Sequence, residues 1–456
     1  MSQPPVAYAQ GMRAGILFAV AGVLCAQAPP DPTEVLAHAR DGLTERGERL
    51  PNYTCVQTVN RKYFRRPKQA HPVPSCTEIT DGEGPAYPMK LYLTDRLRLD
   101  VKVSHGEEIG SWAGARQFDS KSIFELVGSG PFGTGALGTF LSDIFTGAGA
   151  RFEFDGEKSV DGVTLYQYSF QVPVGASHYL VRAGRDWQPV AFDGLFRIEP
   201  HSCDLRHLLV RATKMPLEAE SCEATTSVDY ARVRMGMGDF LLPLRSKLQV
   251  IMTDNYETGT TTTYSGCREY HGEATIRFGD EPPAPAPAQP AEAAAPVTVP
   301  PDLSFSLVLA APVDTDIAAA GDVVTEKVRK PVRDHHSKKV LIPAGTTVRG
   351  RIIRMRHWMH WMDSPSRFDI SIRLETWQAG GITLPLFAKP DPVQEAPPSS
   401  VFRQGLPVTL PPEGLPITVA TFIFPAFRGR YVVPSGFESN WITVAAPPAE
   451  SALPQR

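Results

Sequence analysis

A tract rich in proline and alanine divides this chain of 456 residues. The tract, EPPAPAPAQPAEAAAPVTVPP, runs from residue 281 to residue 301. Such a composition cannot build a packed core and is typical of a semi-rigid, extended linker. We therefore predict two separate domains, at residues 27–280 and 302–445, followed by a disordered tail at residues 446–456.

The composition favours β-structure over helix. The chain contains 43 prolines, which break helix interiors, and many of them stand in X-Pro turns outside the linker. Hydrophobic residues make up 42% of the sequence, so a substantial core can form. The formal net charge is only -3, so no overall positive field favours a nucleic acid as partner.

The N-terminus has the order of a secretory signal. Arg13 precedes an apolar run from Ala14 to Leu24, and small residues follow. Because this run is shorter than a membrane span, we predict a signal peptide at residues 1–26 and export to the periplasm or the outer membrane. Two alternatives stay open: lipidation of Cys25, for which the preceding leucine is a poor fit, and retention of the segment as an uncleaved anchor.

Export makes disulfide bonds possible, because the compartments beyond the inner membrane are oxidising. The cysteines that follow the signal all precede the linker. We expect Cys55 to pair with Cys76 and thereby close a short loop. We expect Cys203 to pair with Cys222, although Cys267 could replace either partner, because connectivity cannot be read from sequence. No zinc-ligand spacing is present, so we predict no metal site.

The first domain begins with a predicted helix over residues 31–50, where Asp31 or Thr33 can cap it and apolar residues recur at helical spacing. The segments that follow alternate apolar and polar residues with a period near two, as in LYQYSF at residues 165–170. One helical insertion, GALGTFLSDIF at residues 135–145, interrupts the strands. The pattern predicts a mainly β, antiparallel domain.

This order of elements resembles a known family. A leading helix, a long series of strands and the segment LPNYTCVQTVNRKYFR are similar to the periplasmic lipoprotein-carrier (LolA/LolB-like) proteins over residues 31–280. The resemblance implies an incomplete antiparallel barrel, or half-barrel, around a helix. It also implies that acyl chains bind in an apolar half-barrel, without assigning any residue to that cavity.

The second domain has short strands joined by tight turns. In IPAG, Pro343 and Gly345 suit a reversal, and Gly380-Gly381 suits a hairpin. Residues 301–390 resemble the TrbI-like β-barrel domain of conjugation and type IV secretion proteins, which implies a small β-barrel but no activity. The residues that carry the resemblance are Gly321, Asp322, Val323, Leu341, Ile342, Pro343, Gly345, Thr346 and Gly350.

Catalytic motifs are not apparent. The sequence contains neither the G-x-S-x-G elbow of α/β-hydrolases nor the H-E-x-x-H helix of zinc proteases. Adjacent acids such as Glu107 and Glu108 fit a solvated surface better than a catalytic pair. We therefore predict a protein that is not an enzyme and that needs no cofactor.

The segment RMRHWMHWM, residues 354–362, has the most unusual composition. Methionine and histidine are suitable ligands for copper(I), but strand alternation places His357 and His360 on opposite faces unless the segment bends. We expect a strand and loop whose tryptophans pack at the rim of the barrel and offer a surface to a partner. The candidates for this contact are Arg354, Arg356, Trp358 and Trp361.

These observations favour an exported, non-enzymatic envelope protein that binds a lipid, a glycan or another envelope component, with contact to a membrane surface possible. Two alternatives stay open. One is a structural or assembly module of an envelope complex. The other is a hydrolase whose active residues come together only in the fold. A continuous apolar cavity would favour the ligand-binding protein, and a filled core would favour the assembly module. A polar cleft that holds a histidine and an acid would favour the hydrolase.

Overall fold

A computed structural model describes most of the chain between the predicted signal and the C-terminus. The predicted signal at residues 1–26 and residues 281–298 of the linker lie outside the described residues. The described residues are 29–65, 75–80, 89–104, 107–115, 118, 122–128, 130–254, 256–270, 299–334, 336–359, 366–391, 408–410, 415–426 and 429–446.

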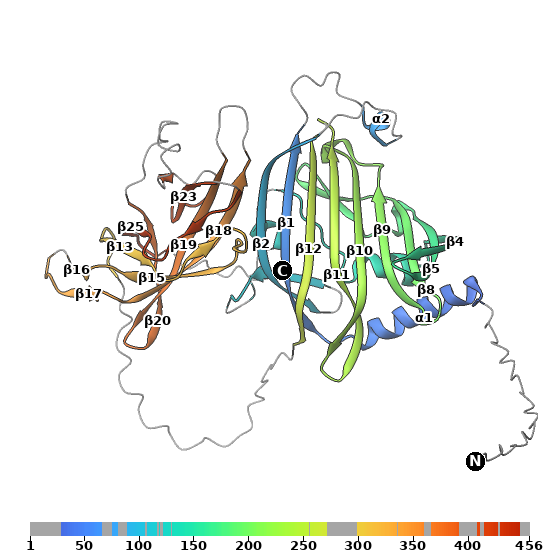
Figure 1. The fold of residues 1–456 in the computed structure, drawn as a ribbon, viewed down its shortest axis with the longest axis horizontal. Helices are drawn as coiled ribbons and strands as arrows, with labels where there is room; N and C mark the ends of the chain where they lie inside the picture. The colour runs from blue at the N-terminus through green and yellow to red at the C-terminus, as the bar shows by residue number, and fades with distance from the viewer. Residues whose placement is uncertain are drawn as a thin grey trace, which may run out of the picture.

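The first part of the chain forms one long antiparallel sheet (Figure 1). Its strands follow the order β4-β5-β8-β9-β10-β11-β12-β1-β2-β3, in which every neighbouring pair is antiparallel. The sheet does not close on itself, because among the described residues β4 and β3 are not paired with each other. The prediction of a mainly antiparallel β-structure with a leading helix is confirmed. The strands are β1 (Tyr53–Arg65), β2 (Lys90–Ser104), β3 (Glu107–Trp112), β4 (Arg151–Val160), β5 (Val163–Val172), β8 (Phe192–Glu199), β9 (Asp204–Ala212), β10 (Ser221–Met235), β11 (Gly238–Met252) and β12 (Glu257–Glu269), beside the small hairpin β6 (Leu180–Ala183) and β7 (Asp186–Pro189).

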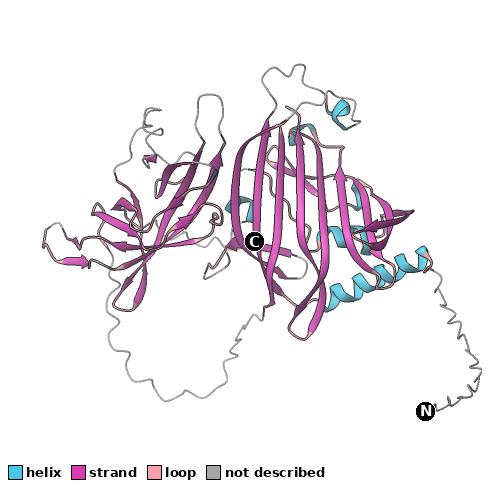
Figure 2. Cartoon of the chain, viewed as in Figure 1, coloured by secondary structure: helices cyan, strands magenta, loops and turns pink. Residues whose placement is uncertain are grey.

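Helices and turns fill much of the inner face of this sheet (Figure 2). Phe140, Ile144 and Phe145 are buried against strand residues such as Phe196 and Tyr168. The helical segments of this part are α1 (Pro32–Arg49), α2 (Cys76–Thr80), α3 (Ile123–Val127), α4 (Thr139–Leu141), the π-helical turn η1 (Ser142–Thr146), and the 3-10 turns η2 (Val174–Ala176) and η3 (Leu217–Ala219).

Helix α1 begins where the sequence predicts. The Asp31 carboxylate accepts hydrogen bonds from the amides of Thr33 (2.8 Å) and Glu34 (3.3 Å), which satisfies two of the free donors at the helix start. Pro32 occupies the first turn, where its missing donor costs nothing. Val35 is buried against the sheet.

The second part has its own buried cluster of side chains. Its strands pair antiparallel in the order β21-β25-β13-β15-β18-β19-β23-β22, with β20 also on β19. The predicted turns at Gly345 and at Gly380-Gly381 are confirmed, with φ of 79°, 55° and 87°. The strands are β13 (Ser304–Leu309), β15 (Val323–Val328), β18 (Thr347–Trp358), β19 (Arg367–Ala379), β20 (Ile382–Pro385), β21 (Ala388–Pro390), β22 (Val408–Leu410), β23 (Val419–Pro425) and β25 (Glu438–Thr443), beside the pairs β14 (Val313–Asp314) with β24 (Val432–Val433) and β16 (Val332–Arg333) with β17 (Val340–Ile342).

A carboxyl group is buried inside this second cluster. Glu326 on β15 is only 2% exposed, and its Oε1 accepts a hydrogen bond of 3.1 Å from the Ser439 hydroxyl. That hydroxyl in turn accepts from the indole of Trp441 at 2.9 Å. Burial raises the pKa of Glu326 to about 7, against the hydrogen bond from Ser439.

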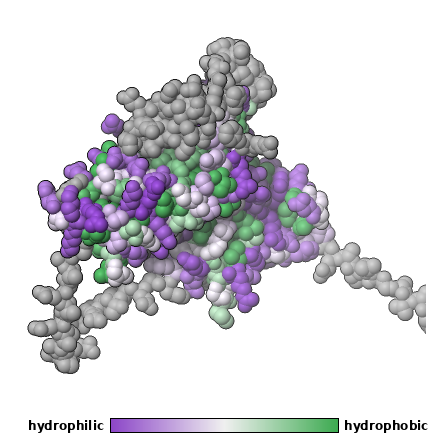
Figure 3. All heavy atoms as spheres, turned by 60° about the vertical axis from the view of Figure 1, so that its left-hand side comes forward, coloured by the Kyte–Doolittle hydropathy of each residue, from purple (hydrophilic) through white to green (hydrophobic). Residues whose placement is uncertain are grey.

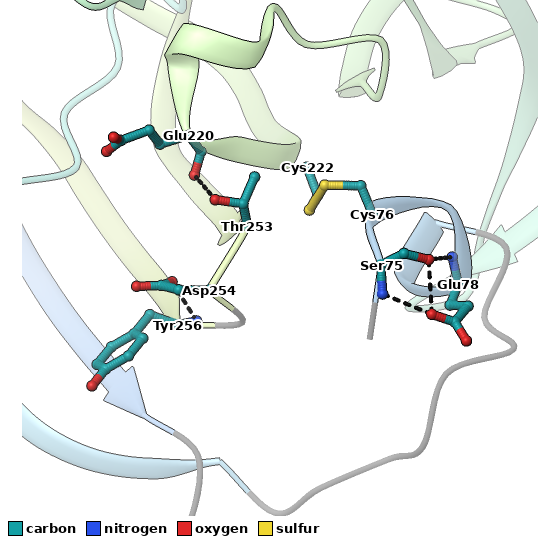
Figure 4. Close-up of a disulfide and its surroundings, with 8 residues drawn as sticks. All are labelled: Ser75, Cys76, Glu78, Glu220, Cys222, Thr253, Asp254 and Tyr256. Atoms are coloured by element: carbon teal, nitrogen blue, oxygen red, sulfur yellow. Dashed lines mark hydrogen bonds between the residues drawn. A yellow bond between two sulfur atoms is a disulfide. The ribbon is translucent and has the colours of Figure 1, made fainter. Parts of the chain in front are cut away.

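Both expected disulfide pairings are wrong. The structure joins Cys55 to Cys267. It also joins Cys76 to Cys222, the bond that Figure 4 shows. Cys203 belongs to neither disulfide, and its sulfur lies 3.8 Å from the carbonyl oxygen of Pro200. Both observed bonds therefore join segments that are far apart in the sequence, separated by 212 and 146 positions.

The direction of β1 explains the first error. The strand continues extended from Cys55 to Arg65, and ten strand residues span about 33 Å. Cys76 lies beyond that strand end, at the start of α2, whereas β12 runs beside β1 and brings Cys267 to within 4.1 Å of Cys55 between their Cα atoms. Strand pairing, and not loop length, decides the partner.

Peptide mapping under non-reducing conditions tests this connectivity. We expect one peptide pair that contains Cys55 and Cys267 and another that contains Cys76 and Cys222. Replacing Cys55 and Cys267 together by alanine should lower the free energy of unfolding by about 2–4 kcal/mol, as removal of a native disulfide typically does. A Cys55–Cys76 peptide in oxidised protein would contradict the structure.

Replacing Glu326 by glutamine tests the buried carboxyl. The pKa of Glu326 in the folded protein, about 7, lies above its ordinary value of 4.5. The carboxyl group therefore stays protonated to a higher pH in the folded state than in the unfolded state. Stability should therefore fall as pH rises from about 4.5 to 7 and stay low above that. Glu326→Gln should remove this fall, so that thermal unfolding shows a gain of up to about 3 kcal/mol at pH 8 and little change at pH 4. An equal effect at both pH values would contradict the assignment.

Candidate functional site

A cavity of about 430 Å³ lies between α1, the turn around α4 and the start of β11. Its volume is within the range of small-molecule sites. The described residues that line it carry no charged side chain. They are Leu43, Thr44, Gly47, Leu50, Pro51, Tyr53, Val103, Ala136, Leu137, Gly138, Leu141, Ser142, Thr146, Tyr230, Phe240, Leu241, Leu242 and Pro243.

The two halves of α1 have different surroundings. In the first half, Val35 and Ala39 are 2% and 0% exposed and belong to the core. In the second half, Leu43 is only half-buried and lines the cavity together with Leu50, which follows the helix. The first half of the helix thus packs into the core, and the second half forms a wall of the cavity.

Three adjacent strands bring two polar side chains, those of Tyr53 and Glu108, to one face of the sheet near the cavity. Tyr53 on β1 pairs with Val103 on β2, and Val103 pairs with Glu108 on β3. Cross-strand partners project from the same face of a sheet, so these three side chains share one face. Tyr53 is 0% exposed, and among the described residues its hydroxyl has no hydrogen-bond partner.

Glu108 fixes the loop that forms one wall. Its carboxylate accepts hydrogen bonds from the backbone amides of Gly135, at 3.0 Å, and Leu137. The Tyr230 hydroxyl donates to the Ala136 carbonyl at 3.1 Å and so holds the same loop. Burial raises the pKa of the Glu108 carboxyl despite the two amides. The expectation that Glu108 lies on a solvated surface is wrong.

A second, more open depression of about 600 Å³ lies over β4, β5, β8 and β9. Its lining is charged: Arg151, Glu153 and Asp155 come from β4, and Asp193 and Arg211 from β8 and β9. Arg211 and Asp193 pair with each other at 3.1 Å. We regard the first cavity as the better candidate, because it is uncharged and bordered by buried core residues.

The unusual segment RMRHWMHWM joins the two parts of the chain. Its strand, β18, pairs antiparallel with the edge of β2, with Arg356 opposite Asp95 and Trp358 opposite Leu93. The amide of Met359 extends this pairing by donating to the Tyr92 carbonyl at 3.0 Å. β3 covers only the other end of β2, so β2 has two successive partners on one edge. We call this junction the seam.

Backbone contacts around Ala320 extend the seam. The amide of Arg98 donates to the Ala320 carbonyl at 2.7 Å, and the amide of Ala320 donates to the Arg96 carbonyl at 2.8 Å. Gly321 follows with φ of 105°. A Cβ atom there would lie 2.1 Å from the Arg98 carbonyl oxygen, so only glycine allows this approach.

Two side chains of the second part reach the first across the seam. Asp322 pairs with Arg98, and its other carboxylate oxygen accepts from the Ala319 amide at 2.9 Å. Arg351, only 5% exposed, donates to the carbonyl oxygens of Ala113 at 2.7 Å and Gly321 at 2.6 Å. Its Nε pairs with Glu375 at 2.9 Å.

The four predicted partner-contact residues divide between this seam and its surroundings. Arg356 and Trp358 lie in the seam, and the Trp358 indole donates to Asp369 at 2.5 Å. Arg354 is half-buried on β18 opposite Ser371, and Trp361 lies outside the described residues. On the face that Figure 3 turns forward, hydrophilic and hydrophobic residues are interspersed. Contact of these residues with another molecule stays a prediction.

The possible copper ligands in this segment have other neighbours. Met355 is 4% exposed inside the second core. The Nε2 of His357 lies 2.9 Å from the Ser366 hydroxyl, its ring stacks on Phe368 at 4.2 Å, and burial lowers its pKa. In the part of the chain that the structure describes, no group of three or more histidine, cysteine, aspartate or glutamate side chains could hold a metal.

Two histidine–carboxylate pairs bear on the hydrolase alternative. The Nδ1 of His178 lies 2.6 Å from buried Asp143, and that of His207 lies 2.8 Å from Asp229. The His178 side chain is 79% exposed. Neither pair lines either of the two depressions described above, so neither supports a catalytic cleft there.

Sequence analysis missed the residues that build the cavity. Tyr53 and Glu108 come from different strands, and their proximity depends on the register of β1, β2 and β3. The segment NYTC, which contains Tyr53, is part of the family resemblance, but it does not identify any residue that contacts a ligand. Arg351, whose guanidinium donates across the seam to Ala113, stands in an ordinary alternating strand and gave no signal.

Among the described residues, no helix has both the length and the apolar character needed to cross a membrane. No protein-family model matches this chain, and no curated protein matches it.

Several solved structures match about half of the chain. A LolA superfamily protein from Nitrosomonas europaea is 8% identical, with 51% of this chain and 94% of that chain covered and a TM-score of 0.25. A DUF1329 family protein from Desulfovibrio piger is 9% identical, with 54% and 95% covered and a TM-score of 0.25. The lipoprotein LppX from Mycobacterium tuberculosis is 10% identical, with 53% and 99% covered and a TM-score of 0.17.

The first of these carries the name of the family that residues 31–280 resemble. At TM-scores of 0.25 or less, these likenesses support no statement about the ligand or the activity of this chain. The TrbI-like resemblance of residues 301–390 stays a prediction.

Replacing Gly321 by alanine tests the seam. The new Cβ should push the second part away from the Arg98 carbonyl and lower the free energy of unfolding by about 2 kcal/mol or more. The control is Gly345→Ala, because Gly345 also has a positive φ, of 79°, but no atom lies within 4 Å of its added Cβ. Calorimetry should show one transition for the natural protein and two for Gly321→Ala. Equal effects of the two substitutions would contradict the seam.

Proposed function

We propose that this protein is an exported, non-enzymatic envelope protein that binds an apolar, chain-like ligand in the cavity beside α1. The observation that carries this proposal is the uncharged lining of that cavity of about 430 Å³. Aliphatic and aromatic side chains dominate the lining, and burying apolar surface is the main favourable contribution to binding there.

The position of the cavity supports a site that can open. One wall is the second half of α1, whose Leu43 is half-buried, unlike the buried Val35 of the first half. Exposed Thr44 and Thr146 lie at the solvent side of the lining. A small outward movement of the helix end would therefore admit a ligand without disturbing the core at Val35.

Two disulfides support export, because such bonds persist in oxidising compartments. One observation supports the assembly alternative: the inner face of the sheet is filled around Phe140, Ile144 and Phe145. That filling leaves a bounded cavity and not a continuous half-barrel pocket, so the ligand we propose is a single chain. The hydrolase alternative has no support from the described cavities.

Blocking the cavity tests the proposal. Gly138 lines the cavity, and no atom lies within 4 Å of a Cβ added there, so a larger side chain has room to start and Gly138→Phe should occupy part of the cavity. The probe is N-phenyl-1-naphthylamine, an uncharged dye that fluoresces in apolar sites. Gly138→Phe should weaken its binding at least about tenfold, because the ring removes apolar volume worth more than two methylene groups.

The matched control is Gly175→Phe. Gly175 is exposed on the turn η2, away from the cavity lining, and an added Cβ there also meets no atom within 4 Å. This variant should bind the dye like the natural protein. Native mass spectrometry of protein released from the periplasm should also show a co-purified lipid that Gly138→Phe lacks. Failure of the natural protein to bind the dye or any lipid would refute the proposed function.

A further inference from the structure

A basic hairpin stands at the outer end of the second part, away from the seam (Figure 1). Its strands, β16 and β17, form a two-stranded sheet of their own, with Val332 opposite Ile342. Both of these side chains are buried in the second core, so the base of the hairpin is anchored. Residues 327–340 contain six lysines and arginines and one acid, Asp334, although the whole chain has a net charge of -3.

The one acid of this segment is committed to the turn of the hairpin. The Asp334 carboxylate accepts hydrogen bonds from the amides of His336 at 3.0 Å and Ser337 at 2.6 Å, and from the Ser337 hydroxyl at 2.9 Å. The Asp334 amide donates to the Lys339 carbonyl at 2.9 Å, which closes the reversal. The carboxylate thus stabilises the backbone of the turn, as aspartate commonly does at such positions.

Most of the basic side chains have no acid to pair with. All six are exposed, and Arg329 pairs with Glu438 at 2.6 Å. Among the described residues, no carboxylate lies within ion-pair distance of the other five, which are Lys327, Lys330, Arg333, Lys338 and Lys339. Exposed charges of one sign that are not neutralised nearby create a local field that attracts a partner of the opposite sign.

The shape of the hairpin restricts what that partner can be. No residue of the hairpin lines either of the two depressions described above, so a projecting tip and not a groove carries the charge. Of its valines, Val328 and Val332 are buried and Val340 is 37% exposed, so little apolar surface is available for insertion into hydrocarbon. A convex, basic tip of this kind fits a broad anionic surface. Beside an anionic bilayer each lysine or arginine contributes about fivefold in affinity.

We propose that the β16–β17 hairpin docks this protein on a bilayer surface that contains anionic phospholipid. The contact is peripheral: ammonium and guanidinium groups lie against lipid phosphates, and no side chain enters the hydrocarbon core. The proposal takes only export from the proposed function and does not involve the cavity. The hairpin and α1 stand at opposite ends of the molecule in Figure 1, so this contact leaves the helical wall of the cavity uncovered.

Co-sedimentation with vesicles tests the proposal. At about 0.05 M salt, the natural protein should bind vesicles with about 30% phosphatidylglycerol about a hundredfold more tightly than vesicles of phosphatidylcholine alone, and about 0.5 M salt should abolish this difference. Combining Lys330→Gln, Arg333→Gln, Lys338→Gln and Lys339→Gln should weaken binding to the anionic vesicles about a hundredfold. Replacing the three lysines by arginine keeps the charge and should keep the affinity.

The matched control removes the same charge from the first part of the chain. Lys158, Arg185, Lys214 and Lys247 are also exposed, and no described carboxylate lies within ion-pair distance of them. Replacing these four by glutamine should change vesicle binding by no more than about threefold, because they lie on other elements. If the hairpin variant fails to fold, Lys330→Gln with Lys339→Gln leaves the hydrogen bonds of the turn in place and should weaken binding about tenfold.

Equal binding of the natural protein to anionic and neutral vesicles would overturn the proposal, and so would equal losses in the hairpin variant and its control. Binding to dextran sulfate, a soluble anionic polysaccharide, without binding to anionic vesicles would also overturn it. The hairpin variant should bind N-phenyl-1-naphthylamine as the natural protein does. A natural protein that binds anionic vesicles but no dye would therefore refute the proposed function and leave the docking surface standing.

Discussion

An open antiparallel sheet depends on something that covers its inner face. Strands β2 and β10 alternate buried with partly exposed residues along most of their length, so one face of the sheet is apolar there and must be kept from water. Helix α1 and the turns between α3 and η1 supply the cover. Because the turns between α3 and η1 are short and irregular, they do not fill the whole face, and the cavity beside Leu43 and Tyr53 is the space that remains.

The same sheet has a second requirement at its edge. An edge strand presents unpaired amides and carbonyls, and a protein usually protects them. β3 protects one end of β2, and β18 with the segment around Ala320 protects the other. The linker that divides the sequence therefore does not leave two independent bodies, because backbone pairing and the Arg351 guanidinium hold the parts together. The buried Arg61–Asp95 pair, at 2.6 Å, stands on β1 and β2 next to this junction.

Sequence reasoning was most successful where the signal is local. Asp31 and Pro32 mark the start of α1, and the alternation in LYQYSF marks a strand, because both follow from interactions within a few residues. It failed where the decisive partner is distant. Loop length favours the nearest later cysteine as the partner of Cys55, although β12 brings Cys267 beside it. Local sequence favours a solvated surface position for Glu108, because nothing near it in the chain shows that the Gly135 amide donates to its carboxylate.

The sequence by itself determined the helix at the start and the antiparallel β character of the chain. These depend on side-chain periodicity and on backbone propensity, which each segment carries alone. Only the tertiary structure decided the disulfide partners, the seam at Gly321 and the set of uncharged residues that line the cavity. Those features depend on strand register and on the close approach of segments that are distant in sequence. No single stretch of residues determines either of these.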